Sequence, residues 1–218
     1  MTRFHALLPV LALTAACAAG GTTVIEDEGM TNTGKTLGTQ AGDLAGLEED
    51  AEESAVQSKV NAMGGTMQTL AGQHISYGAS SGTGIPGLSR AELAQGSTEY
   101  AWDGTNLVLV YAAEGTGLTY EVRLAYTSND VGGTTIDGTY VVGIATGASG
   151  VGVGYALDVT FDQVAADDAG CVVSGAIDIS YEVGVSGLEG IPGADLANQS
   201  GRVVATYLGC DDVQISGS

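Results

Sequence analysis

The chain has 218 residues, with 26 acidic and 6 basic side chains and a formal net charge of −20. Such a charge repels nucleic acid and anionic lipid head groups, which makes both poor candidates as partners of the polypeptide. Glycine is frequent, at 35 residues, and with threonine, valine and tyrosine it indicates short strands joined by tight turns.

The first 16 residues have the features of a secretion signal. A short charged start, an apolar run over residues 6–13 and small residues before Cys17 follow one another in the order of a signal peptide. The apolar run is far shorter than the roughly 20 residues that a membrane-spanning helix needs. We therefore expect a cleaved signal; an ordinary signal peptide would be cut near Ala16 or Ala19.

The segment Leu13-Thr14-Ala15-Ala16-Cys17 resembles the lipobox of bacterial lipoproteins, although that family usually has leucine in place of Thr14. The resemblance implies that residues 1–16 are removed, that Cys17 carries a lipid, and that this lipid anchors the protein in a membrane. Loss of Arg3 would leave 5 basic and 26 acidic residues, a net charge of −21. Ala18, where inner-membrane lipoproteins of enteric bacteria have Asp, favours the outer membrane, on its periplasmic or its surface face.

Residues 17–42 show no apolar period and are rich in glycine and threonine, which predicts a lipid-anchored flexible tether. Residues 43–218 are then expected to form one helix plus an antiparallel β-domain. Asp43 is the predicted N-cap of a long amphipathic helix over 43–72. The helix would bury Leu44, Leu47, Ala51, Val56, Val60, Met63, Met67 and Leu70 along one stripe. The pair Gly64-Gly65 should bend or break it.

From about residue 75 the apolar period changes from helical spacing to two. Apolar and polar residues alternate over 119–127, 155–162 and 173–183, as expected of antiparallel strands with one wet face. Further strands are predicted near 97–103, 106–113, 138–146, 202–209 and 212–216, with turn signals such as Asp103-Gly104 between them. The fold class is therefore mainly β, an antiparallel meander of about eight strands after one helix. The pattern leaves open whether the sheet is an open or half barrel, a closed barrel or a sandwich.

Cys171 and Cys210 remain as a pair if Cys17 is lipidated, and an oxidising compartment favours a disulfide between them. An antiparallel pairing in which Ile177 faces Val204 would also place the two cysteines opposite each other. The alternatives are a reactive thiol or a metal site. Two cysteines without a nearby histidine do not complete a usual zinc shell.

Four aspartates flank the paired cysteines and would meet at one end of the sheet in this arrangement. Carboxylate oxygens bind calcium, but no calcium-binding motif is present, and solvated turns explain the same residues. We therefore expect no metal and no cofactor. The weak calcium candidates are Asp167, Asp168, Asp211 and Asp212.

Little in the sequence supports catalysis, and we expect that the protein is not an enzyme. Residues 78–82 match the G-x-S-x-G string of serine hydrolases around Ser80, but their Gly-rich, polar flanks do not predict the strand and helix that this elbow needs. His74 is the sole histidine after the signal, and it precedes Ser80, contrary to the hydrolase order. Its place at a helix end suits the helix dipole, which is a sufficient explanation for it.

Aromatic residues are the remaining candidates for a binding site. Core packing is their simplest explanation, and they would line a ligand cavity only if the sheet curls. These residues are Trp102, Tyr100, Tyr111, Tyr120, Tyr126 and Tyr155.

Two functions are compatible with this sequence. The first is a noncatalytic, lipid-anchored β-domain of the cell envelope with a structural or interaction role, whose protein or small-ligand partner is unknown. The alternative is a carrier or binder of a small apolar ligand, in which a curled sheet holds the ligand beneath a helix lid. This second reading is a fold-level analogy to lipocalins and lipoprotein-localisation factors. A buried, largely apolar cavity would favour it over the first.

Overall fold

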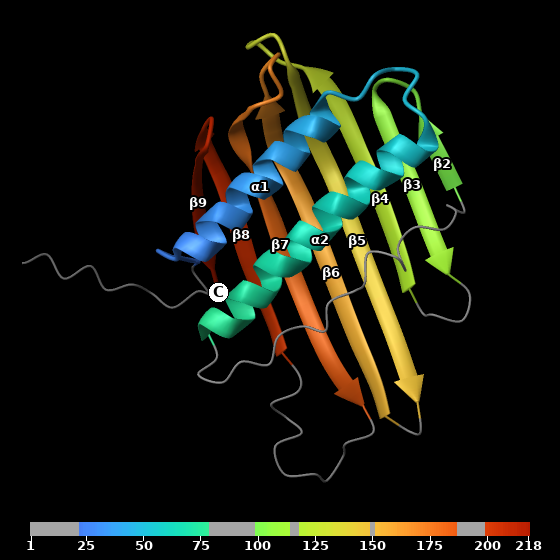
Figure 1. Cartoon of the computed structure of the whole chain (residues 1–218), viewed down its shortest axis with the longest axis vertical. Coiled ribbons are helices and arrows are strands. Elements are labelled where there is room, and N and C mark those ends of the chain that lie inside the picture. Colours follow the sequence, from blue (N-terminus) through green and yellow to red (C-terminus); the bar gives the residue numbers. More distant parts are fainter. Residues whose placement is uncertain (1–21, 79–98, 114–117, 149–150, 187–198) are drawn as a thin grey trace, which may run out of the picture.

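Nine antiparallel strands form an open sheet, and two helices lie across one of its faces (Figure 1). This computed structural model describes residues 22–78, 99–113, 118–148, 151–186 and 199–218. The strand order is β1-β9-β8-β7-β6-β5-β4-β3-β2, so β2 to β9 form a meander and β1 adds to the edge at β9. The predicted mainly-β meander is confirmed. Since β1 and β2 are the two edges, the sheet closes into neither a barrel nor a sandwich.

The eight predicted strands correspond to β2 through β9, and a ninth, the two-residue β1, was not predicted. Strand β1 is too short to show a period, and it forms because Thr23 pairs with Gly217 of β9. The strands are β1 (Thr23–Val24), β2 (Glu99–Trp102), β3 (Asn106–Ala113), β4 (Leu118–Ser128), β5 (Thr134–Ala148), β6 (Val151–Ala166), β7 (Val172–Ser186), β8 (Gln199–Gly209) and β9 (Asp212–Gly217).

Helix α1 runs from Glu28 to Ala45, so the predicted flexible tether is wrong for residues 28–42. Asp27 caps the helix by accepting a hydrogen bond from the Met30 amide at 2.8 Å, which satisfies one of the free N–H groups at the helix start. Three threonines of α1 donate their hydroxyls to the carbonyl four residues earlier. Asp43, the predicted N-cap, lies in the last turn of this helix.

Helix α2 runs from Glu53 to Gly78. The single helix predicted over 43–72 is therefore wrong, because residues 46–52 separate two helices. The helical spacing of apolar residues continues across the break because Leu47 and Ala51 of the connection pack against the same core. Neither described helix is long and apolar enough to cross a membrane.

The predicted break at Gly64-Gly65 is also wrong, since α2 continues through both residues. Gly64 is buried against the hydroxyl of Tyr140, and a β-carbon at this position would overlap that oxygen. Gly65 lies on the exposed side, with no atom within 4 Å of a β-carbon built on it. Packing against the sheet thus keeps this segment helical despite the low helix propensity of glycine.

Close contact between α1 and the sheet depends on three glycines spaced four residues apart. A β-carbon at Gly38 would lie 2.6 Å from Cε1 of Tyr207, and one at Gly42 would overlap the carbonyl oxygen of Gly170. The Tyr207 hydroxyl donates to the carbonyl of Gly34 at 3.1 Å, at a buried position. The helix backbone therefore rests directly on β8 and on the turn between β6 and β7.

The core lies between the helices and the covered face of the sheet. Strand β4 alternates buried and exposed residues along its length, as predicted for a strand with one wet face. All eight residues predicted for the helical stripe are buried in the core or packed against it, but they come from α1, α2 and their connection. The largest fully buried helix side chains are Met30, Leu37, Leu44, Met63, Met67 and Leu70.

The turn at Asp103-Gly104, between β2 and β3, forms as predicted. The Asp103 carboxylate accepts hydrogen bonds from the hydroxyl and amide of Thr105, both at 2.8 Å, and from the amide of Asn106 at 2.6 Å. These bonds, chiefly those from Thr105, lower the pKa of Asp103 to about 2. Asp103 therefore stays ionised at neutral and moderately acidic pH, and its carboxylate stabilises this turn under those conditions.

Two glycine-to-alanine substitutions should have opposite effects on stability. Gly42→Ala should lower the free energy of unfolding by about 2 kcal/mol, because the new methyl group forces α1 away from Gly170. Gly65→Ala should raise it by about 1 kcal/mol, because an exposed helical position gains propensity without a clash. Urea unfolding followed by circular dichroism measures both. Equal effects of the two substitutions would contradict the close approach of α1.

Candidate functional site

The face of the sheet opposite the helices is a broad, solvent-exposed surface. Side chains from neighbouring strands form a row across it, because Val141, Asp158, Ser180 and Arg202 are successive partners from β5 to β8. Apart from the charged groups, the row consists of small side chains, and its members are exposed. We call this surface the open face.

Both arginines of the open face are already paired with carboxylates. Arg123 forms an ion pair with Glu121 on the same strand. Arg202 on β8 reaches across to Asp178 on β7, where its Nε lies 2.8 and 2.9 Å from the two carboxylate oxygens and its Nη2 makes a further contact. The partners raise the pKa of each arginine further, so both stay charged. Because each arginine is neutralised by one carboxylate, the remaining carboxylates make the open face negatively charged.

A shallow hollow of about 650 Å³ lies on the open face over β5 to β8. Its polar lining includes the carboxylates of Asp158 and Glu182 and the hydroxyls of Ser180 and Ser200. Arg202 stands at one side, held by Asp178. The hollow therefore offers hydrogen-bonding groups and negative charge to a ligand or partner.

The aromatic candidates lie mostly on the covered face, where they pack against one another. Tyr111 and Tyr120 stack with ring centroids 5.1 Å apart, and Tyr120 and Tyr140 follow at 6.3 Å. The Tyr120 hydroxyl accepts a hydrogen bond from the Gln57 amide of α2 at 3.1 Å. The series fills the space under α2, which favours the packing interpretation over a ligand cavity.

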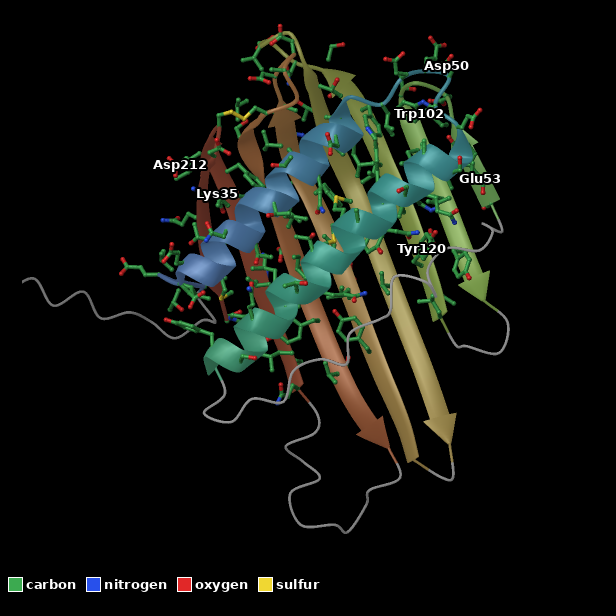
Figure 2. All side chains as sticks on the ribbon, in the orientation of Figure 1. Lys35, Asp50, Glu53, Trp102, Tyr120 and Asp212 are labelled. Carbon is green, nitrogen blue, oxygen red and sulfur yellow. A yellow bond between two sulfur atoms is a disulfide. The ribbon has the colours of Figure 1, made fainter. Side chains whose placement is uncertain are left out.

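Trp102 and Tyr100 join β2 to the connection between the helices, and Figure 2 shows Trp102 beside that connection. The Trp102 indole donates to the Glu48 carbonyl at 2.7 Å, and the Tyr100 hydroxyl donates to the Ala51 carbonyl at 2.9 Å. Trp102 also meets Tyr126 edge-on at 4.8 Å between ring centroids. These contacts give both residues a structural role.

Two buried hydroxyls have no hydrogen-bond partner within the described part of the chain, those of Tyr126 and Tyr155. Burial raises the pKa of both phenols well above the usual value, with neighbouring tyrosines adding to the effect. Neither residue can therefore act as a base or a nucleophile near neutral pH.

His74 lies in the last two turns of α2, as expected, but its contacts differ from the dipole role predicted for it. Its Nδ1 is 2.9 Å from the Tyr181 hydroxyl of β7, and its ring rests on Gly217, where a β-carbon would overlap it. Burial lowers the pKa of the imidazole. The pair joins the end of α2 to the sheet.

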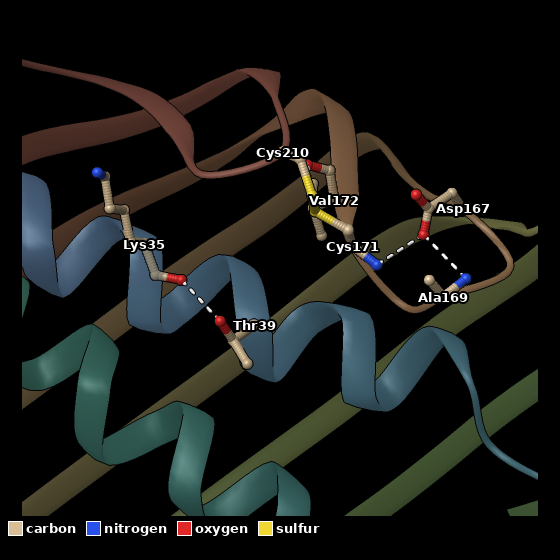
Figure 3. Close-up of a disulfide and its surroundings, with 7 residues drawn as sticks. All are labelled: Lys35, Thr39, Asp167, Ala169, Cys171, Val172 and Cys210. Atoms are coloured by element: carbon tan, nitrogen blue, oxygen red, sulfur yellow. Dashed lines mark hydrogen bonds between the residues drawn. A yellow bond between two sulfur atoms is a disulfide. The ribbon is translucent and has the colours of Figure 1, made fainter.

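The predicted disulfide is present and links Cys171 to Cys210, with the two Cα atoms 5.7 Å apart (Figure 3). The register predicted with it is wrong by one residue, because Ile177 faces Ala205 and not Val204. The β7–β8 pairing ends at Gly175 and Tyr207, so the two cysteines lie beyond it and do not fix its register. Both strands are irregular near this end: Gly175 has φ of +104° beside shifts in the β6–β7 register, and the β8–β9 register shifts between Tyr207 and Gly209.

The four aspartates proposed as weak calcium candidates flank the two cysteines of the disulfide. The carboxylate of Asp167 closes its own turn by accepting hydrogen bonds from the amides of Ala169 at 3.0 Å and Cys171 at 2.8 Å. Within the described ranges, no three His, Cys, Asp or Glu side chains are grouped as metal ligands. Asp167, Asp168, Asp211 and Asp212 therefore lie in or beside the two turns that the disulfide joins, without forming a group of metal ligands in the described residues.

Several predicted features lie outside the described residues. These are the signal peptide over 1–16, the lipidation site Cys17 and the G-x-S-x-G string around Ser80. Comparison of the chain with known protein families, curated proteins and solved structures found no match. The functional argument therefore depends on the residues described above.

Stability should fall on acidification through His74. Because burial lowers its pKa in the folded state from 6.5, the unfolded chain binds the proton first, and stability is lost as the pH falls through 6.5. We expect His74→Gln to lose less stability than the wild type between pH 7.5 and pH 5.5, measured by urea unfolding. Equal losses in both proteins would show that His74 does not contribute.

Proposed function

We propose that the protein is a noncatalytic, lipid-anchored protein of the cell envelope that binds a partner through the open face. The signal-like N-terminus and Cys17 support the anchor and the location. The observation that carries the interaction role is the contrast between the two faces of the sheet: helices cover one, and the other is exposed across its central strands.

The open face suits contact with a partner because its uncharged side chains are mostly short. Residues such as Thr139, Ala156 and Ser180 leave the strands accessible to a flat surface, and Val141 adds exposed apolar area. Since both arginines are paired, the unpaired carboxylates favour a partner with basic side chains. A membrane of anionic lipids would be repelled, so the open face would point away from it.

The carrier alternative has less support. The described part of the space between the helices and the sheet is filled by methionine, leucine and stacked tyrosine side chains, several of them fully buried. Opening a ligand cavity there would require α2 to leave Tyr120 and Tyr140, at the cost of the packing that holds the helix.

The anchor is tested by Cys17→Ser. We expect the substitution to abolish incorporation of labelled fatty acid and to release the protein from the membrane fraction, since the thiol is the acceptor of the lipid. The wild-type chain treated in parallel is the control. Continued fatty-acid incorporation into the variant would refute the lipoprotein assignment.

Photo-crosslinking in the native cells tests the open face as an interaction surface. A photoreactive residue at Ser180 or Ser200, in the hollow, should give a discrete crosslinked product, and the yield should drop when Asp158 and Glu182 are neutralised as D158N and E182Q. Exposed helix positions Thr36 and Ser58 serve as matched controls and should give no such product. Products from the helix positions alone would contradict the proposal.

A further inference from the structure

We propose that the Cys171–Cys210 disulfide is a redox-sensitive clasp that keeps the C-terminal half of α1 docked on the sheet. The bond joins the turn before β7 to the turn after β8, across 39 residues of sequence. Both cysteines line a cavity of about 190 Å³ whose opposite wall is α1. Figure 3 shows the bond beside Lys35 and Thr39 of that helix.

The disulfide ties the two turns together where strand pairing has ended. Pairing between β7 and β8 reaches Gly175 with Tyr207 and has no described partners beyond them. Past this point, the turn that contains Gly170 and the turn that contains Asp211 are joined by the sulfur–sulfur bond. Its cleavage would let these two turns separate without disturbing the paired strands.

Helix α1 rests on the two parts that the bond joins. Gly42 packs directly on the carbonyl of Gly170, which immediately precedes Cys171. Gly38 packs on Tyr207, three residues before Cys210. Separation of the turns would therefore remove the close fit along the second half of α1. Helix α2 is held by contacts with Tyr120, Tyr140 and Tyr181, none of which belongs to the two turns.

The bond is open to attack by an external dithiol. Cys210 is exposed and Cys171 is half-buried, so a thiolate would attack Sγ of Cys210 and release Cys171 as a thiolate that takes up a proton. The second thiol of the reagent then attacks the mixed disulfide, which frees Cys210. The protein gains two electrons and two protons, and the dithiol becomes a disulfide.

Hydrogen exchange of the full-length protein in detergent tests this coupling, with dithiothreitol as the dithiol. Reduction should speed amide exchange in residues 34–45 about tenfold or more and leave residues 56–70 of α2 within about twofold. The double variant Cys171→Ser/Cys210→Ser should show the fast pattern without reductant and no further change on its addition. Equal acceleration of both helices, or none in α1, would overturn the clasp.

The rate of reduction tests access to the bond separately. Under native conditions it should rise in proportion to the dithiothreitol concentration, because the attack occurs on the folded protein. A rate that reaches a plateau equal to the rate of global unfolding would show that the bond is sealed in the folded state, and it would overturn the proposal.

Discussion

The close approach of helix backbone to strand side chains is the constraint on which this fold depends. An open sheet of nine strands has two faces, and one of them must be removed from water for the chain to bury a core. Helix α1 achieves this because glycines at positions 34, 38 and 42 let it contact Tyr207 and the turn at Gly170 directly. Helix α2 makes the same kind of close contact with the sheet, because Gly64 packs directly against Tyr140.

This constraint also separates the packed side of the molecule from its exposed side. The tyrosines, the tryptophan and His74 are used to hold the helices, their connection and the sheet together. In the described residues, the open face carries none of these packing contacts, and its shallow hollow holds the carboxylates of Asp158 and Glu182 beside the Arg202–Asp178 ion pair. A protein built this way has its core on one side and an exposed surface on the other, which is the basis for the proposed interaction role.

The strands could be predicted because alternation over long, half-buried segments is a strong signal, as in β4 and β6. Helix α1 could not, since its glycines and threonines are common in linkers, and their roles in packing depend on a sheet more than 100 residues away in the sequence. The disulfide was found by counting cysteines, whereas the register near Gly175 depends on a local backbone conformation that carries no residue pattern. The open face could not be predicted as a candidate site, because its small polar residues are also typical of an ordinary solvent-exposed strand face.

A double-mutant cycle between Gly38→Ala and Tyr207→Leu tests the close approach of α1 most directly. If the helix backbone rests on the tyrosine ring, Gly38→Ala should cost about 2 kcal/mol in the wild type and far less once the ring is gone. The coupling free energy should then exceed about 1 kcal/mol. Effects that add within about 0.5 kcal/mol would mean that the two residues do not meet, and would contradict this account of how the sheet is covered.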